Sequence, residues 1–439
     1  MFKAHREKFL AKLPPNSIAV LRAAPLRTMS NDVEYLYRQD SNFWYVTGIE
    51  DPEAVALFLP NAIDGRRYVV FVKPRNPRLE SYEGPRIGPE EAATEYGADA
   101  AFSTDEFADR MARYDAASRT FSGYLVGVEK VYLSDGGDNA WAKTLRDTIE
   151  TMRARDAGPS TIVDAREVLH EMRVVKDADE LTLIRRATEI SGGGHVLAMK
   201  AAAPDRYEFE VQQALDGYCS SNGARRMAYP SIVASGPNSV FLHWDRNDRQ
   251  IRDGDVVLND SGAEYGYYAT DITRTYPANG RFRAEQRAIY DVVLAAQKAA
   301  MAEIKPGAPF ERIGQAAARV QTAGLVKLGL LSGDVQKLVR ENGHRAFTKH
   351  GISHWVGLDV HDAGRYSVGS TSRPLEPGMV FTVEPGIYIG SNLGVDRKWW
   401  NIGVRIEDVV LVTKDGYECL SCFVPREAVE VEKTVLSGR

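Results

Sequence analysis

The sequence predicts a mixed α/β domain at the N-terminus followed by a larger α+β domain. Three observations lead to this fold class. Short β-rich runs alternate with helical stretches in the first part of the chain, whereas longer helices separate strand-like pieces in the second. The length of 439 residues corresponds to two or three domains at roughly 100–200 residues each. We therefore expect one domain over residues 1–174 and another over residues 175–439.

The first domain contains four runs with the composition of strands and two with the spacing of helices. The strands are predicted at 18–21, 55–59, 68–72 and 131–133, and the helices at 105–111 and 139–152. This alternation is typical of a sheet covered by helices. The segment 162–172 is expected to connect the two domains.

The second domain is predicted to open with a capped amphipathic helix. Asp177 precedes Glu180 by three residues, which is the spacing of a capping box, and apolar residues then recur at helical spacing as far as Ile190. Further helices are expected at 284–304 and 310–328, and strands at 256–260, 270–276, 380–384 and 404–412. The helix at 284–304 ends before Pro306-Gly307, which cannot continue it.

Composition excludes several classes of function. Lys and Arg total 55 against 60 Asp and Glu, so the net charge of -5 offers no basic excess for nucleic acid or anionic lipid. We expect no signal peptide and no membrane span, because no apolar run approaches ~20 residues. Three cysteines, Cys219, Cys419 and Cys422, cannot form a disulfide framework, which favours a reducing compartment and a cytoplasmic location. No function is assigned to the CLSC sequence.

Histidines gather in the second domain. Of eight in the chain, four are His243, His350, His354 and His361, and three of these lie within KHGISHWVGLDVH. A surface histidine cluster is one interpretation. The neighbouring residues are apolar with glycines between them, which favours imidazoles that pack against buried side chains.

Four acidic residues lie in apolar strands. A hairpin that turns at Gly262–Gly266 would bring Asp260 and Asp271 together, while Glu384 and Glu407 lie in two later strands, Glu407 close to Arg405. Buried carboxylates need a partner charge, which either arginine or lysine side chains or metal ions supply. Two divalent cations would balance four carboxylates, and one histidine would complete the ligand set. Oxygen-dominated ligation suits Mn²⁺ best, with Co²⁺, Fe²⁺ or Zn²⁺ as alternatives.

Four motifs carry a resemblance to a known family. NDSGAEYGYYATDITRTYPANGRF, HGISHWVGLDVHDAG, LEPGMVFTVEPGIYIG and GVRIEDVVLV resemble the pita-bread metallopeptidases of the aminopeptidase P and prolidase family. YRQDSNFWYVTGIEDPEAVALFLP is similar to the noncatalytic N-terminal domain of that family. The resemblance implies a noncatalytic domain over 1–174 and a pita-bread catalytic domain over 175–439. The metal ligands that it implies are Asp260, Asp271, His354, Glu384 and Glu407.

The resemblance also implies roles around the metal ions. His243, His350 and His361 match pocket histidines that position substrate and move protons, Arg405 matches an arginine beside the ligands, and Tyr388 and Arg373 match substrate-binding positions. We expect two metal ions to hold a bridging hydroxide that attacks the peptide, with Glu384 as general base. His350 or His361 would bind the developing oxyanion, and His243 would serve the departing nitrogen.

The activity implied is removal of the N-terminal residue from peptides with proline at the second position. An Xaa-Pro dipeptidase restricted to dipeptides is the enzymatic alternative, and a non-catalytic pita-bread module that binds peptides or proteins is a remote one. A homo-oligomer, dimer or tetramer, is also expected. The resemblance also places Tyr82 in a region where a related chain offers tryptophan to a neighbouring subunit's pocket.

Overall fold

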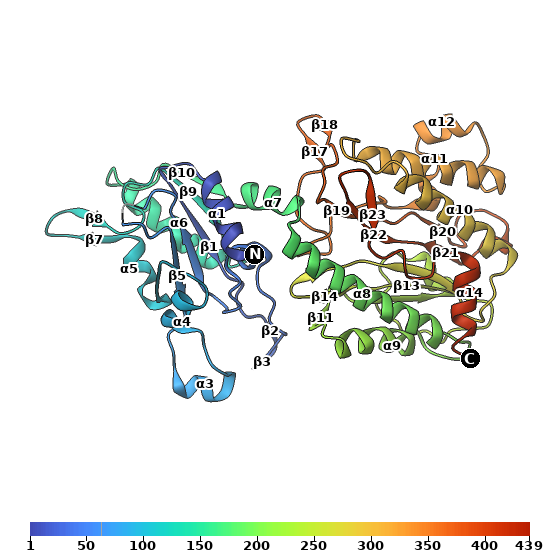
Figure 1. The fold of residues 1–439 in the computed structure, drawn as a ribbon, viewed down its shortest axis with the longest axis horizontal. Helices are drawn as coiled ribbons and strands as arrows, with labels where there is room; N and C mark the ends of the chain where they lie inside the picture. The colour runs from blue at the N-terminus through green and yellow to red at the C-terminus, as the bar shows by residue number, and fades with distance from the viewer. Residues whose placement is uncertain (63) are drawn as a thin grey trace. The chain divides into compact units, whose positions relative to one another are not determined.

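The computed structural model describes residues 1–62 and 64–439, which form two compact units, Met1–Met172 and Arg173–Arg439 (Figure 1). The division lies two residues before the one expected from the sequence. The fold class is confirmed: the first unit is α/β and the second is α+β.

The first unit is built on a mixed six-stranded sheet with the order β10-β9-β1-β4-β5-β6. Its strands are β1 (Ser17–Arg22), β4 (Val55–Phe58), β5 (Tyr68–Val72), β6 (Ala100–Ser103), β9 (Lys130–Ser134) and β10 (Thr161–Asp164). Its helices are α1 (Phe2–Lys12), α2 (Ser41–Thr47), α3 (Pro77–Glu83), α4 (Gly88–Thr94), α5 (Phe107–Met111) and α6 (Asn139–Arg153). Two small hairpins pair β2 (Thr28–Ser30) with β3 (Val33–Glu34) and β7 (Arg113–Asp115) with β8 (Thr120–Ser122).

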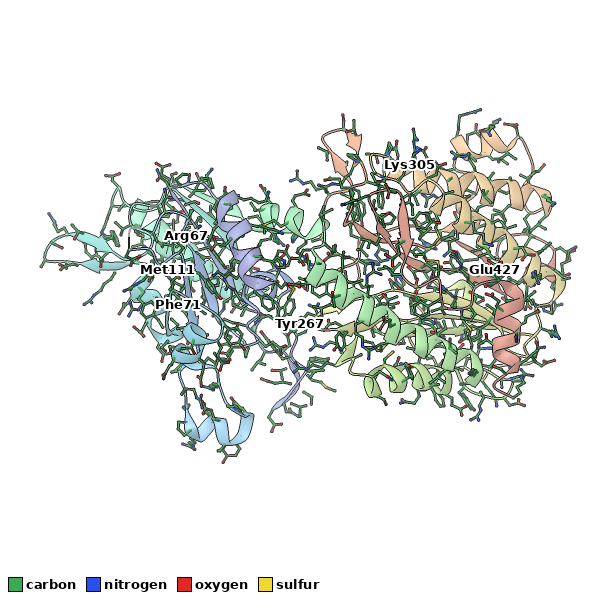
Figure 2. The ribbon with its side chains drawn as sticks, viewed as in Figure 1. Arg67, Phe71, Met111, Tyr267, Lys305 and Glu427 are labelled. Atoms are coloured by element: carbon green, nitrogen blue, oxygen red, sulfur yellow. A yellow bond between two sulfur atoms is a disulfide. The ribbon has the colours of Figure 1, made fainter. Side chains whose placement is uncertain are left out.

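The core of this unit lies between the sheet and its helices. Phe71 of β5 and Met111 of α5, both labelled in Figure 2, belong to one cluster of buried apolar side chains. The segment 162–172 was expected only to connect domains, and this was wrong. It forms most of β10, which pairs in parallel with β9, and of α7 (Arg166–Val174). Four-residue strands such as β10 give too short a pattern to be recognised alone.

The second unit contains several small sheets and the helices that pack against them. The helices are α8 (Ala178–Ala201), α9 (Glu208–Ser221), α10 (Ala284–Met301), α11 (Glu311–Lys327), α12 (Val335–Arg340), α13 (Arg345–Thr348) and α14 (Ala428–Leu436). The earlier strands are β11 (Arg226–Met227), β12 (Ile232–Ser235), β13 (Val256–Asp260), β14 (Ala263–Tyr265), β15 (Tyr268–Ala269) and β16 (Thr273–Pro277). The later strands are β17 (Ser367–Val368), β18 (Thr371–Ser372), β19 (Val380–Val383), β20 (Gly386–Ile389), β21 (Ile402–Arg405), β22 (Asp408–Val412) and β23 (Tyr417–Cys419).

Helix α8 begins as predicted. The Asp177 carboxylate accepts from the backbone N–H groups of Asp179 and Glu180, and the Glu180 carboxylate accepts from the N–H of Asp177, so the capping box is complete. Helix α8 packs against α9 and contacts β14 and β15, whereas α10 packs against α11 and contacts β19, β20 and β21. The two helix pairs therefore support strands from the two halves of the unit.

Among the described residues, no helix combines the length and the apolar composition that crossing a bilayer requires.

Candidate metal centre

Asp260 and Asp271 meet at one end of an antiparallel strand pair. Asp260 ends β13, and its pairing partner is Thr273 at the start of β16, so Asp271 lies just before that strand. The predicted simple turn between them was wrong, because β14 and β15 form a second hairpin there. Gly262 permits this path: a Cβ on it would lie 1.8 Å from the carbonyl oxygen of Thr270. The close backbone approach brings Asp271 alongside Asp260.

Glu384 and Glu407 lie at two strand breaks that face each other. The predicted continuous strand 404–412 is in fact β21 and β22, with Ile406 and Glu407 between them. Glu384 likewise lies between β19 and β20. Strand β19 pairs with β22, whereas β20 pairs with β21. Each of the two segments, 380–389 and 402–412, therefore changes its pairing partner at the position of its glutamate. The two glutamates are thereby directed away from the regular ladders.

His354 is fixed beside these carboxylates. Its backbone exchanges hydrogen bonds with Thr382 of β19, and its Nδ1 lies 3.1 Å from the carbonyl oxygen of Trp355. A carbonyl only accepts, so Nδ1 carries the proton and Nε2 presents a lone pair. That Nε2 lies 3.4 Å from Asp271 Oδ2, 3.6 Å from Glu384 Oε1 and 3.9 Å from Glu407 Oε1. This is the tautomer that a metal ligand requires.

The carboxylates carry more negative charge than their protein neighbours neutralise. Burial and the charge of Asp260 raise the pKa of Asp271 well above its usual range, and burial and the charge of Asp271 do the same for the pKa of Glu407. Burial and the charge of Glu407 raise the pKa of Glu384 to about 8. Burial would also raise the pKa of Asp260, but Arg405 and Tyr229 outweigh it and lower that pKa.

The donor set therefore fits divalent cations. Glu407 Oε2 accepts from the Thr273 hydroxyl at 2.7 Å, whereas its Oε1 is buried with no hydrogen-bond partner among the described residues. One ligand atom each from Asp271, His354 and Glu407 lies within 4.8 Å of the others. Of the described residues lining the cavity, Arg405 carries the one permanent positive charge. Carboxylate oxygens with one imidazole suit Mn²⁺, Co²⁺, Fe²⁺ or Zn²⁺.

A cavity of about 550 Å³ opens onto these groups. All five predicted ligands line it, together with His243, His350, His361 and Arg405. Apolar side chains supply another part of its wall: Pro230, Ile232, Leu242 and Val360. Nine of the eleven predicted site residues thus share one cavity.

Two predicted residues do not line the cavity. Tyr388 is buried behind it, where its hydroxyl accepts from Arg405 Nη1 at 2.8 Å and lies 2.7 Å from His350 Nε2. Arg373 is absent from the described lining, and its guanidinium donates to the carbonyl of Arg365. Tyr388 therefore acts on its neighbours within the wall, and Arg373 gains no support as a substrate contact.

His350 and His361 are held differently. His350 Nδ1 lies 2.5 Å from the carbonyl oxygen of Gly351, so Nδ1 carries the proton and Nε2 accepts from Tyr388. The ring of His361 lies 4.0 Å from the ring of His354, centre to centre. Burial and Arg405 lower the pKa of His350 to about 4, and burial with His354 and His243 lowers that of His361 to about 4. Both imidazoles are neutral at pH 7.

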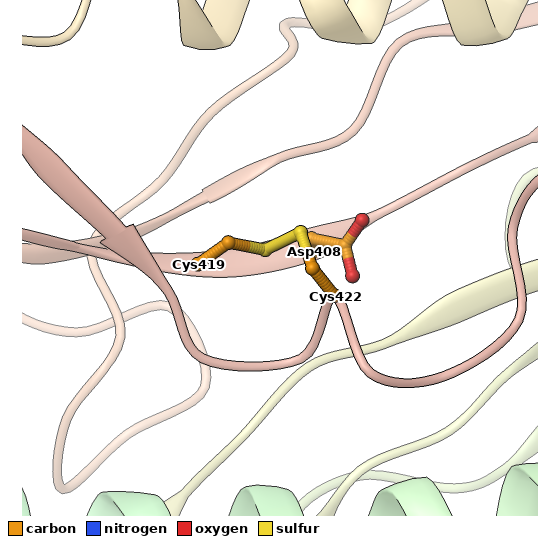
Figure 3. Close-up of side chains that lie close together, drawn as sticks. All are labelled: Asp408, Cys419 and Cys422. Atoms are coloured by element: carbon orange, nitrogen blue, oxygen red, sulfur yellow. A yellow bond between two sulfur atoms is a disulfide. The ribbon is translucent and has the colours of Figure 1, made fainter.

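Among the titratable residues that line the cavity, sequence reasoning missed Tyr229 and Asp245. Neither belongs to a histidine cluster or to a run of strand carboxylates, so no spacing signal marked them. It also missed the disulfide between Cys419 and Cys422, which lies beside Asp408 (Figure 3). Because two of the three cysteines form this disulfide, the cysteine content no longer favours a reducing compartment.

Comparisons with known proteins agree with this geometry. The model of metallopeptidase family M24 matches residues 182–414, and that of the aminopeptidase P N-terminal domain matches residues 2–121. The chain is 38% identical to the Xaa-Pro aminopeptidase of Escherichia coli, over 100% of this chain and 98% of that protein. It is 39% identical to the Xaa-Pro aminopeptidase of Haemophilus influenzae, over 98% and 96%.

Solved structures are equally similar. Pseudomonas aeruginosa aminopeptidase PepP superimposes with a TM-score of 0.94 at 42% identity, covering 100% of this chain and 98% of that one. Escherichia coli aminopeptidase P with the inhibitor Pro-Leu gives 0.93 at 38% identity with the same coverage. A zinc-substituted form of that enzyme in complex with product gives the same values.

Proposed function

The chain belongs to metallopeptidase family M24, and from this premise we infer that it is an Xaa-Pro aminopeptidase, which removes the N-terminal residue from peptides with proline at the second position. The observation that carries the function is the convergence of five potential ligands on one cavity with their negative charge largely uncompensated.

We propose that Asp260, Asp271, His354, Glu384 and Glu407 hold two divalent cations, with Mn²⁺ the expected metal. Divalent cations bound there supply Lewis-acid chemistry, because they polarise a peptide carbonyl and make a water molecule more acidic. The unpartnered Glu407 oxygen and the raised carboxyl pKa values support this assignment.

The protein's own groups then move protons and bind charge. Glu384 takes a proton from the attacking water. Its Oε2 lies 3.6 Å from His350 Nδ1, which places that imidazole beside the proposed base. Both nitrogens of His350 already have partners. We therefore assign the developing oxyanion to His361, since no hydrogen bond ties its ring to another described residue. His243, also on the cavity wall, serves the departing nitrogen.

Selection for proline is assigned to the apolar part of the wall. A prolyl nitrogen carries no hydrogen in the peptide, so it cannot donate a hydrogen bond to an acceptor on the protein. Ile232, Leu242 and Val360 offer a surface that fits the ring instead.

A peptide panel tests the proposed activity. Chelator-stripped protein is supplied with Mn²⁺, Co²⁺ or Zn²⁺ and offered Xaa-Pro and Xaa-Pro-Yaa peptides, with Xaa-Ala-Yaa as the control. We expect cleavage of Xaa-Pro-Yaa with a strong preference for proline, highest with Mn²⁺. Cleavage of dipeptides alone would make the protein a prolidase, and no cleavage with any metal would leave a binding module.

We also propose a homo-oligomer, dimer or tetramer, and a cytoplasmic location. Exposed apolar side chains on and beside the β2–β3 hairpin support self-association; they are Met29, Val33, Tyr35 and Leu36. Tyr82, which is 85% exposed, also offers an apolar contact. Light scattering on the protein as it elutes from a size-exclusion column measures the number of subunits. A monomer at all protein concentrations would contradict the proposed homo-oligomer.

A further inference from the structure

Tyr229 holds a position that the proposed reaction does not yet use. Its hydroxyl lies 2.6 Å from Asp260 Oδ1 and 2.5 Å from Asp271 Oδ1, so one phenol joins two proposed metal ligands. A phenol has a single O–H, so the two Oδ1 atoms share one donor.

The fold holds the Tyr229 ring in place. Tyr229 follows β11, which pairs with β14, and the N–H of the preceding Ala228 donates to the carbonyl of Gly262 at 2.8 Å. A Cβ on Gly262 would lie 3.2 Å from the Tyr229 ring as well as 1.8 Å from the Thr270 carbonyl oxygen. The same glycine therefore makes room for the ring and for the chain that carries Asp271.

The hydrogen bonds also decide which oxygens remain available. The phenol occupies Oδ1 of both aspartates, and Asp260 Oδ2 accepts from Arg405 Nη2. Asp271 Oδ2 is thereby turned toward His354 Nε2, 3.4 Å away. Without the phenol, two buried carboxylates would face each other with no shared donor, and each could rotate about its χ2 bond.

We propose that Tyr229 is a positioning residue of the metal centre, which orients Asp260 and Asp271 jointly before a cation binds. This inference rests on the proposed ligand set but goes beyond it. Groups that orient metal ligands through a hydrogen bond typically contribute about 10–100-fold to metal affinity. Tyr229 acts through the aspartates, so its loss should weaken metal binding more than it impairs turnover of the loaded enzyme.

The test is a Mn²⁺ titration by calorimetry of chelator-stripped wild type, Tyr229→Phe and Tyr276→Phe. The Phe variant at 229 keeps the ring and removes only the hydroxyl. Tyr276 is the matched control: it lies in β16, and its buried hydroxyl accepts from Asn259 at 3.3 Å away from the cavity. We expect about a 10–100-fold weaker dissociation constant for Tyr229→Phe, and wild-type affinity for Tyr276→Phe. At saturating Mn²⁺, Tyr229→Phe should regain most of the wild-type kcat.

The outcomes separate this inference from the proposed function. If wild type binds no divalent cation, the metal centre itself is refuted. If wild type binds Mn²⁺ and Tyr229→Phe binds it equally well, the positioning role is refuted. Equal affinity with a kcat that excess metal does not restore would place Tyr229 on the substrate instead. Circular dichroism checks folding, and Tyr229→Leu, which also lacks the donor, replaces the Phe variant if that one does not fold.

Discussion

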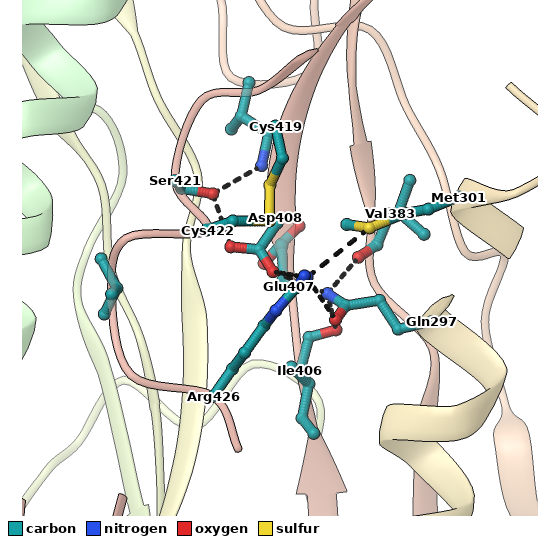
Figure 4. Close-up of a disulfide and its surroundings, with 12 residues drawn as sticks. Gln297, Met301, Val383, Ile406, Glu407, Asp408, Cys419, Ser421, Cys422 and Arg426 are labelled. Carbon is teal, nitrogen blue, oxygen red and sulfur yellow. Dashed lines mark hydrogen bonds and ion pairs between the residues drawn. A yellow bond between two sulfur atoms is a disulfide. The ribbon is translucent and has the colours of Figure 1, made fainter. Parts of the chain in front are cut away.

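Two buried carboxylates that are neighbours in sequence, Glu407 and Asp408, have opposite surroundings (Figure 4). Asp408 accepts from Arg274 at 2.7 Å, from Arg426 at 3.0 Å and from Gln297 at 3.0 Å, and it also accepts from the Ser421 hydroxyl. Glu407 accepts from one hydroxyl, and its other oxygen has no partner among the described residues.

Glu407 and Asp408 are both buried, so they differ in the number of positively charged side chains beside them. Asp362, in the same unit, is also buried, which alone would raise its pKa, but Arg173 and Lys176 outweigh burial and lower it. At the cavity, the four carboxylates that we propose as ligands have Arg405 as the one permanent cation in the described lining, and the pKa of Glu384 rises to about 8. The chain neutralises its structural carboxylates with its own side chains, whereas we propose that divalent cations neutralise those at the cavity.

The largest expected effect concerns turnover. Glu384→Ala removes a proposed ligand and the proposed base together, so kcat should fall by about 10²–10⁴-fold or more. Asp271→Ala should lower metal content as well as turnover. Initial rates with Xaa-Pro-Yaa and metal analysis of the purified variants measure both, and wild-type activity in either variant contradicts the assignment.

The next effect contrasts the two kinds of carboxylate in metal-free protein. Asp408→Asn leaves Arg274 buried without its ion pair and should cost about 3 kcal/mol or more of unfolding free energy. Asp271→Asn removes a charge from a repulsive cluster and should stabilise the metal-free protein. Urea denaturation in the presence of chelator measures the unfolding free energy of both variants. Destabilisation of similar size in both would contradict the difference between structural carboxylates and those at the cavity.

The pH dependence of metal-free stability sharpens the same contrast. The pKa of Glu384 is raised from 4.5 to about 8, so the stability that its protonated form preserves is fully present below pH 4.5 and lost as pH rises through about 8. Metal-free protein should therefore show a falling Tm between pH 5 and 8.5. Saturating Mn²⁺ should flatten this fall, because bound cations favour the charged carboxylates. A metal-free Tm that does not fall over this range contradicts the prediction.

The smallest effect is expected at the disulfide. Cys419 and Cys422 are three residues apart, so their bond closes a short loop and should contribute about 2 kcal/mol or less. The double variant Cys419→Ser, Cys422→Ser should lower stability slightly and leave Mn²⁺ affinity unchanged, because Ser421 still bonds Asp408. A large loss of Mn²⁺ affinity would show that the Asp408 cluster and the metal centre are coupled.

Local signals in the sequence predicted the regular elements well. The Asp177 cap of α8 and the apolar strand β5 depend on neighbouring residues, and both were predicted. The ligand positions came from the resemblance, since charge balance alone left arginine partners and metal ions both open. The strand break at Glu407 was missed, because apolar residues lie on both sides of Glu407 and Asp408, and the break shows only in the change of pairing from β20 to β19.

Partners that are distant in sequence were also missed. Tyr229 meets Asp260 and Asp271 through a glycine-dependent backbone approach that no spacing reveals. Tyr388 was expected at the substrate, whereas its hydroxyl contacts Arg405 and His350 behind the cavity wall, a place that follows from packing. The substrate roles of Arg373 and the histidines stay predictions.

We propose that the uncompensated carboxylates bind divalent cations that the reaction needs. Titrating Mn²⁺ into chelator-stripped protein while measuring bound metal and Xaa-Pro-Yaa hydrolysis at each point tests it most directly. We expect two ions to bind per chain, with hydrolysis rising as they bind. Full hydrolysis by protein that holds no metal, or a folded protein that binds no divalent cation, would contradict it.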